Sequence, residues 1–146
     1  NPDNQIYVSR IDKLYKNKIT KYKNANNKIN LKTLFIQNPG INISNLCVNK
    51  QSFINLSGFD TTIPVGADKS FAIDCLLSKL SFKVLEHNQE ICRFHDGYRI
   101  SKNPKKLIQS HIAFYKKYKK IMNYYQKFFL LYKIFFLIIF KKYNIK

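Results

Sequence analysis

The chain has 146 residues and a mass of 17.3 kDa, which is the length of one ordinary domain. Its content of 45% hydrophobic and 23% charged residues excludes a disordered tail and a fibrous repeat, and four Gly and four Pro argue against a turn-dense sandwich. The formal net charge is +18, of which +13 lies in residues 97–146, a segment without acidic residues. This segment should therefore be attracted to polyanions, either nucleic acid or an anionic membrane surface.

The first half of the chain predicts short, mixed elements. Residues 1–30 are polar, with apolar residues spaced near the helical period, and predict a surface helix followed by a loop. Residues 31–48 are rich in β-forming residues around two turn signals and predict short strands joined by loops. Asn49 should cap a short helix over residues 50–57, which Gly58 ends.

A longer helix is predicted over residues 69–80, with Asp68 as its N-cap, because apolar residues recur on one side. Two short strands, Phe82–Glu86 and Glu90–Phe94, should follow around a turn at residues 87–89. This order of strand, helix and strand is typical of an α/β or α+β domain.

The last part of the chain is a basic tail with a helical pattern. From Pro104 to about Gln126 the apolar residues recur at helical spacing with four lysines clustered between them, which predicts a basic amphipathic helix. Residues 128–140 are apolar except for Lys133 and would extend about 20 Å as a helix, less than a membrane's hydrocarbon core. We expect this segment to lie in a membrane interface, with packing against the protein's own core as the alternative. The residues expected at the membrane surface are Lys116, Lys120, Phe128, Phe129, Phe135 and Phe136.

The cysteines and the first residues indicate the cellular compartment in which the protein is expected to occur. Cys47, Cys75 and Cys92 are odd in number and widely spaced, which predicts buried free thiols in a reducing compartment and no zinc site. The opening residues lack the apolar run of a secretory signal. Because the only methionine is Met122, we expect the chain to begin partway through a longer protein.

Residues 44–101 contain four features in a fixed order. A Ser-Asn-x-x-x-x-Lys segment and a short helix lead to the turn Ser57–Asp60, with the sequence Ser-Gly-Phe-Asp. Asp68 then stands at the head of a helix, a Lys-Val strand follows, and Arg-Phe-His at residues 93–95 precedes Ile-Ser at residues 100–101. In this order and spacing, the features resemble the second half of the catalytic domain of family-2 glycosyltransferases, which are inverting enzymes of the GT-A fold that use nucleotide sugars.

The resemblance covers residues 30–110 and implies a fold class and a domain organisation. The chain would be an α/β protein with a partial GT-A (nucleotide-diphospho-sugar transferase) fold, short strands and a helical C-terminal extension. Residues 1–30 would be a helical or loop lead-in, residues 31–103 the acceptor-side half of the transferase domain, and residues 104–146 the basic and hydrophobic tail.

The resemblance also implies a catalytic residue. A sugar hydroxyl has a pKa far above 7, so its attack on an anomeric carbon needs a carboxylate within reach to remove the proton. Asp68 is the candidate general base, and the helix N-terminus would favour its ionised form. The alternative is that Asp68 only caps the helix.

Further residues are expected to bind substrate or metal. His95 matches a late histidine that contacts the metal or the diphosphate, with a structural histidine as the alternative. Arg99 and Lys102 could neutralise the departing diphosphate, unless they are charges on a solvated loop. Asn45 and Asp60 are also expected on the substrate side, with Asp60 fixing its turn by an Asx-type bond. We expect Asp74, within the same helix as Asp68, to face solvent.

The chain departs from the family pattern in ways that limit the activity expected of it. Ser57 and Ala67 stand where the family usually has Gly and Glu, and no Asp-x-Asp segment occurs. The complete enzyme is expected to use a divalent metal, Mg or Mn, which this chain alone is not expected to bind. We therefore expect this chain to be a fragment that is inactive alone.

The expected partners are a nucleotide-sugar donor and a polysaccharide, lipopolysaccharide or lipid-linked acceptor. The expected location is cytoplasmic, peripheral on the inner face of the cell membrane. The alternative function is a non-enzymatic basic protein that binds a polyanion or a membrane surface. We expect no nucleic-acid partner, because no DNA- or RNA-binding motif is present and only three of the basic residues are arginine.

Overall fold

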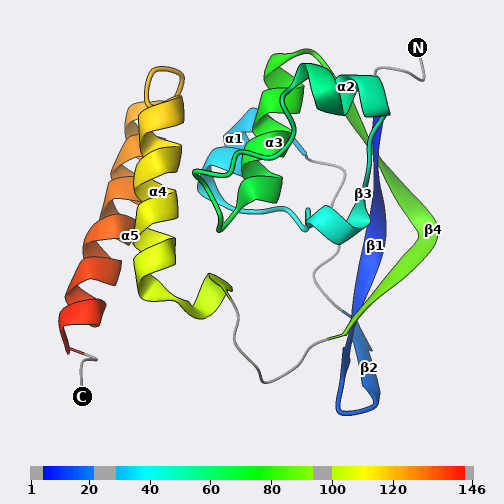
Figure 1. The fold of residues 1–146 in the computed structure, drawn as a ribbon, viewed down its shortest axis with the longest axis horizontal. Coiled ribbons are helices and arrows are strands. Elements are labelled where there is room, and N and C mark those ends of the chain that lie inside the picture. The colour runs from blue at the N-terminus through cyan, green and yellow to red at the C-terminus, as the bar shows by residue number, and fades with distance from the viewer. Residues whose placement is uncertain (1–4, 22–28, 94–99, 144–146) are drawn as a thin grey trace.

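The computed structural model describes residues 5–21, 29–93 and 100–143. They form a mixed α/β structure whose elements lie in three layers (Figure 1). A sheet lies on one side, helices α1 and α3 lie in the middle, and an antiparallel pair of helices, α4 and α5, lies on the other side. The mixed α/β class expected from the sequence is confirmed.

The sheet is built around one long strand. Strand β1 pairs in parallel with β4 along one edge, and antiparallel with β2 and with the two-residue strand β3 along the other. Lys16 and Asn17 form the β1–β2 turn with φ angles of 46° and 62°, the left-handed region that tight hairpins require. The strands are β1 (Gln5–Tyr15), β2 (Lys18–Lys21), β3 (Leu46–Cys47) and β4 (Ser81–Arg93).

Two predictions about strands are wrong. The surface helix expected in residues 1–30 is the β1–β2 hairpin, in which Ile6 and Val8 alternate with half-buried neighbours and lie in the core. The two strands expected after residue 81 are one strand, β4, which follows β1 in a single direction. Its pairing register shifts between Leu85 and Gln89, where the turn was expected.

The helices include one predicted accurately and one that replaces predicted strands. Helix α2 begins after Asn49, whose side chain accepts bonds from the backbone N–H groups of Gln51 and Ser52, as expected. Helix α1 occupies a segment expected to be strand, because Asn30 caps it by accepting from Thr33 N at 2.9 Å. The α-helices are α1 (Leu31–Ile36), α2 (Lys50–Asn55), α3 (Ala67–Leu77), α4 (Pro104–Tyr118) and α5 (Tyr124–Tyr143), with 3-10 turns η2 (Ile43–Asn45) and η3 (Ile100–Lys102).

Helix α3 is buried on two sides, and this explains the arrangement of layers. Phe71 and Cys75 pack with Ile6 of β1 toward the sheet. Ala72 and Ile73 pack on the other side, in a cluster with residues of α1, α4 and α5. Burial of this apolar surface on both sides makes α3 the centre of the core.

The long helix expected from Pro104 to Gln126 is two helices. Helix α4 ends at Tyr118, and Asn123 and Gln126 start α5 by a reciprocal capping box, in which each side chain accepts the other's backbone N–H at 2.9 Å. The chain reverses between them, so α5 packs antiparallel to α4 (Figure 1).

Candidate active site

Asp68 lies in the first turn of α3. The N-cap is Gly66, with a φ of +88°, so the prediction that Asp68 itself is the N-cap is wrong. The Asp68 carboxylate accepts the backbone N–H of Lys69 at 2.7 Å, and no side-chain donor bonds to it within the described ranges. The side chain is half-buried, and this burial raises its pKa, although backbone hydrogen bonds and the charge of Lys69 oppose the shift. The net effect is opposite to that expected from the helix N-terminus, and it makes the carboxylate a stronger base.

The expected substrate residue Asn45 lies inside the protein. Only 4% of it is exposed, and its amide donates to the carbonyl oxygens of Ser9 at 2.9 Å and Gly40 at 3.0 Å. Its side-chain oxygen accepts Asn42 N at 2.8 Å. These bonds tie the η2 loop to β1, so burial contradicts the prediction that Asn45 binds substrate.

Of the remaining expected substrate and metal residues, the structure describes Asp60 and Lys102. Asp60 fixes its turn as expected, by accepting Thr62 N at 2.9 Å and the Thr62 hydroxyl at 2.6 Å. Lys102 is exposed in η3, the short turn before α4. Arg99 and His95 lie outside the described residues.

A polar cluster that the sequence analysis missed ties α4 to α3. The ammonium of Lys117 lies 3.0 Å from Asp60 Oδ2 and 2.8 Å from Asp74 Oδ2. The Tyr118 hydroxyl lies 2.7 Å from Ser70 Oγ and donates to Asp74 Oδ1 at 2.8 Å. The expectation that Asp74 faces solvent is therefore wrong, because Asp74 binds two residues of α4.

The charges of this cluster stabilise one another. The hydrogen bond from the Thr62 hydroxyl, with a further one from Lys117, lowers the pKa of Asp60 against the effect of burial. Burial alone would lower the pKa of Lys117, but hydrogen bonds and charges from Asp74 and Asp60 outweigh it and raise that pKa. The cluster therefore has a structural role, in which both carboxylates bind Lys117.

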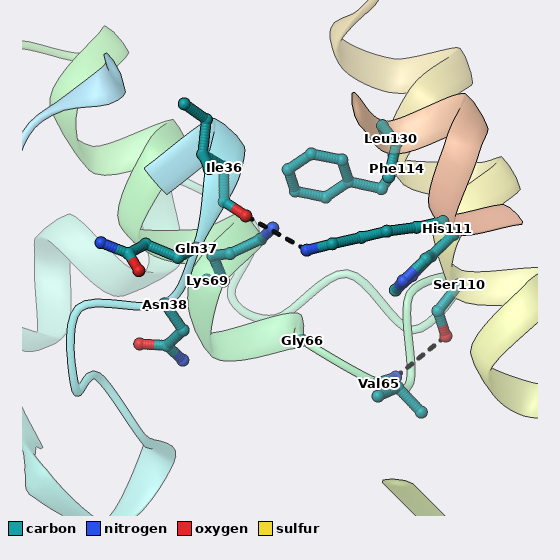
Figure 2. A pocket seen from close by; sticks show the side chains of 11 residues that line it. Ile36, Gln37, Asn38, Val65, Gly66, Lys69, Ser110, His111, Phe114 and Leu130 are labelled. Carbon is teal, nitrogen blue, oxygen red and sulfur yellow. Dashed lines mark hydrogen bonds between the residues drawn. The ribbon is translucent and has the colours of Figure 1, made fainter. Parts of the chain in front are cut away.

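A second polar feature is a pocket of about 180 Å³ between α1, α3, α4 and α5, which we call the basic pocket. Figure 2 shows Lys69 and His111 reaching toward it from opposite walls. Lys133 of α5 also lines it and donates to the carbonyl oxygen of Ile36, at the end of α1, at 3.2 Å. The other lining residues are Gln37, Asn38, Val65, Gly66, Ser110, Phe114 and Leu130.

The basic groups of this pocket have lowered pKa values. Burial, followed by the nearby charge of Lys133, lowers the pKa of Lys69 to about 8, although Asp68 opposes the shift. Burial and the charges of both lysines lower the pKa of His111 to about 4, so its imidazole is neutral at pH 7. Burial also lowers the pKa of Lys133. The sequence offered one signal of this pocket, Lys133, the single lysine that interrupts the apolar residues 128–140.

The described residues do not fit the divalent metal that the resemblance implies. Within the described ranges, no group of three or more His, Cys, Asp or Glu side chains is placed to hold a metal ion. Asp60 and Asp74 both bind Lys117, and Asp68 takes no part in these ion pairs.

The free thiols also differ from expectation. All three cysteines were expected to be buried, but Cys75 is buried and Cys47 is exposed. The Cys92 side chain lies outside the described residues.

Helix α5 exposes a large apolar surface on the side away from the core. Leu130 and Ile134 are buried against the core, whereas Tyr124 is 91% exposed and Phe128 is 69% exposed. Of the residues expected at a membrane surface, Lys116, Lys120, Phe128, Phe135 and Phe136 are exposed, and Phe129 is half-buried with the Lys133 ammonium 4.3 Å from its ring centre. The large exposed side chains, which we call the outer face of α5, are Tyr124, Tyr125, Phe128, Leu131, Tyr132, Phe135, Phe136 and Ile138.

No helix among the described residues combines the length and apolar character needed to cross a membrane. Comparison of the chain with protein-family models, with curated proteins and with solved structures finds no match.

Proposed function

We propose that the chain is the acceptor-side part of a family-2-like, inverting glycosyltransferase in which Asp68 is the general base. The observation that carries the proposal is the Asp68 carboxylate itself. It is half-buried at the start of α3, burial raises its pKa, and it accepts the backbone N–H of Lys69. The order of the turn Ser57–Asp60, helix α3 and strand β4 supports the same proposal.

The proposed chemistry gives one step to this carboxylate. Asp68 would take the proton of an acceptor hydroxyl while the hydroxyl oxygen bonds to the anomeric carbon and the nucleoside diphosphate leaves from the opposite face. Binding of the donor would require a nucleotide-binding part that the described residues do not supply. A divalent metal there would neutralise the leaving diphosphate, and the described residues provide no ligand set for it.

The test is a transfer assay on the longest natural protein that contains this chain, with panels of nucleotide sugars and glycan or lipid-linked acceptors. We expect Asp68→Asn to lower the transfer rate by about 10²–10⁴-fold, the contribution of a positioned general base, with donor binding unchanged. Asp74→Asn is the matched control, because it removes a carboxylate of the same helix that Lys117 and Tyr118 already bind. Equal loss in both variants, per folded molecule, would reject Asp68 as the base, and transfer by the 146-residue chain alone would contradict its assignment as an inactive part.

We further propose that the chain binds peripherally to an anionic membrane surface, on the cytoplasmic side of a cell membrane, through the outer face of α5. The exposed aromatic and aliphatic side chains of this face carry the proposal. Residues 97–146, which include α5, have a net charge of +13 that complements anionic lipid. Aromatic rings are favoured at headgroup depth, where lysines can reach phosphates.

Vesicle sedimentation tests this attachment. We expect the double variant Phe128→Ser/Phe135→Ser to bind anionic vesicles at least about tenfold more weakly, because two rings of the outer face are lost. Ile54→Ser is the control, because Ile54 is 55% exposed but lies on α2. Equal vesicle binding by the double variant and by Ile54→Ser would reject the outer face of α5 as the contact with the membrane.

The alternative function is a non-enzymatic protein that only binds membrane surfaces. It is favoured by the same outer face of α5 and needs no role for Asp68. Vesicle binding that depends on Phe128 and Phe135, together with absence of transfer by the longest natural protein, would support it over the glycosyltransferase.

A further inference from the structure

The basic pocket brings together three basic side chains without an acidic one. Lys69 comes from the first turn of α3, His111 from α4 and Lys133 from α5, and no Asp or Glu among the described residues lines the pocket. Helix α3 and the consecutive helices α4 and α5 therefore place basic groups around one small space, and Figure 2 shows two of these groups, Lys69 and His111. Such an arrangement is costly in an empty pocket, because the two lysines repel each other and are both partly removed from water.

The hydrogen bonds that the two lysines make within the protein leave N–H donors of both ammonium groups available to a ligand. Among the described residues, no hydrogen-bond acceptor or ion-pair partner binds the Lys69 ammonium, which lies 4.3 Å from the centre of the Phe114 ring. The Lys133 ammonium has three N–H donors and uses one of them on Ile36 O. Asn38 bonds within its own turn: its amide nitrogen donates to the carbonyl oxygen of Ile41 at 2.6 Å, and its side-chain oxygen accepts the backbone N–H groups of Gly40 and Ile41.

We infer that the basic pocket binds the phosphate group of an anionic ligand, held by Lys69, Lys133 and His111. A phosphate carries enough negative charge to balance two ammonium groups and has oxygen acceptors for several donors. The pocket of about 180 Å³ has room for a phosphate and its first linking atoms, and the rest of a larger ligand would extend beyond it. This inference does not depend on the proposed transfer reaction.

The positions of the three groups also predict a spectroscopic signature. His111 has a pKa of about 4 because of burial and the charges of Lys69 and Lys133. The groups that face it in the pocket are these two lysines, from α3 and α5, and Asp68 lies beside Lys69 in the chain. A bound phosphate would offset the positive charge and raise the pKa of His111. The chain has three histidines, so their ring signals can be resolved by NMR.

The experiment is a titration of the full 146-residue chain with inorganic phosphate, followed by the NMR signals of the histidine rings and by thermal unfolding. We expect phosphate to shift the His111 ring signals, to raise its pKa and to raise the unfolding temperature. Lys69→Met should bind phosphate about tenfold or more weakly, because one charged donor is lost. Lys32→Met, which removes an exposed lysine from α1, should leave phosphate affinity unchanged.

Two results would overturn the inference. One is that millimolar phosphate changes neither the His111 signals nor the unfolding temperature of the wild-type protein and that phosphatidic acid vesicles give no Lys69-dependent binding. The other is that Lys69→Met and Lys32→Met weaken phosphate binding equally, which would indicate general surface attraction. The wild-type measurement does not depend on whether a variant folds.

Vesicles distinguish the two sources of a phosphate group. Phosphatidylcholine vesicles with and without phosphatidic acid are compared for binding of the wild type, Lys69→Met and Lys32→Met. Binding to phosphatidic acid that Lys69→Met alone weakens, and that free phosphate competes away, would identify a lipid headgroup. A response to inorganic phosphate without this Lys69-dependent vesicle binding would identify a soluble phosphate compound.

Discussion

The buried charge of Lys69 should add a contribution to the stability of this protein that rises with pH above about 8. In the folded protein its pKa is about 8, against 10.5 for an unburied lysine. At about 1.4 kcal/mol per pKa unit, this difference corresponds to about 2–3 kcal/mol once residual solvent in the pocket is allowed for. The perturbation is Lys69→Met, which keeps much of the side-chain volume and removes the charge.

The sign follows from proton binding in the two states. Below pH 8 Lys69 is protonated in both states, and the folded state bears the full cost of the buried charge. Between pH 8 and 10.5 the folded protein loses this proton while the unfolded chain still holds it, so the free energy of unfolding rises with pH. Lys69→Met lacks this dependence and should be more stable than the wild type at pH 7 by about 2–3 kcal/mol.

Urea unfolding measures this effect as the difference between the two proteins at each pH, in a buffer without phosphate. The difference cancels other titrations, such as that of Cys75, whose pKa burial raises to about 12 and which therefore destabilises the fold at high pH. We expect the stability advantage of Lys69→Met to shrink steadily from pH 8 toward pH 10.5. An advantage that is constant over this range, or absent at pH 7, would refute the argument that the pocket holds an uncompensated charge. Lys32→Met should show neither the gain nor the pH dependence.

Three further substitutions test contacts elsewhere, each by urea unfolding at pH 7. Lys117→Met should lower the free energy of unfolding by about 1–2 kcal/mol, because two partly exposed carboxylates lose their partner, whereas the exposed neighbour Lys116→Met should have no effect. Gly58→Ala should lower it by about 2 kcal/mol, because Gly58 has a φ of +65° and an added Cβ would lie 2.9 Å from the Phe53 ring; a neutral result would contradict this geometry. Ser57→Gly should raise it by about 0.5–1 kcal/mol, because Ser57 has a φ of +59°, and a loss of stability would show that its side chain has another role.

The parts of the fold that could be predicted from the sequence depend on local signals. Asn49 caps α2 through bonds to residues two and three positions ahead, so the cap and the helix were both predictable. The start of α3 was predicted within two residues from the spacing of its apolar residues, although Gly66 and not Asp68 is the cap. The break between α4 and α5 also had a local signal, the Asn123-x-x-Gln126 capping box, which the continuous apolar pattern obscured.

The sheet was not predictable in the same way, because its strands are defined by partners far along the chain. Strand β1 pairs with β4, about 75 residues away in the sequence, and both run in the same direction. The β1–β2 turn uses Lys16 and Asn17 in place of the Asn-Gly or Asp-Gly pair that would have indicated a hairpin. Apolar residues in this segment also fit a helical spacing, so the helix and the hairpin could not be distinguished without the partner strand.

In the candidate site too, the positions of residues along a helix were predictable from the sequence, but the residues that surround them in the folded protein were not. The sequence placed Asp68 at the start of a helix, but its raised pKa results from burial that only the packed structure provides. The sequence also suggested that Asp74 faces solvent. That prediction failed because its partners, Lys117 and Tyr118, come from a helix more than 40 residues later. Spacing along one helix gives the side on which a residue lies, and not what packs against that side.

The two proposals for α3 meet at consecutive residues. Asp68 and Lys69 have Cα atoms about 3.8 Å apart, and successive positions on a helix point about 100° away from each other. Lys69 lines the basic pocket, whereas Asp68 is not among the lining residues. A phosphate bound at Lys69 would therefore leave the Asp68 carboxylate unoccupied, and only a part of the ligand that extends beyond the pocket could reach that carboxylate. If both proposals hold, the acceptor that suits this site is one that carries a phosphate within about one sugar unit of the hydroxyl that reacts, as phosphate-linked glycan and lipid acceptors do.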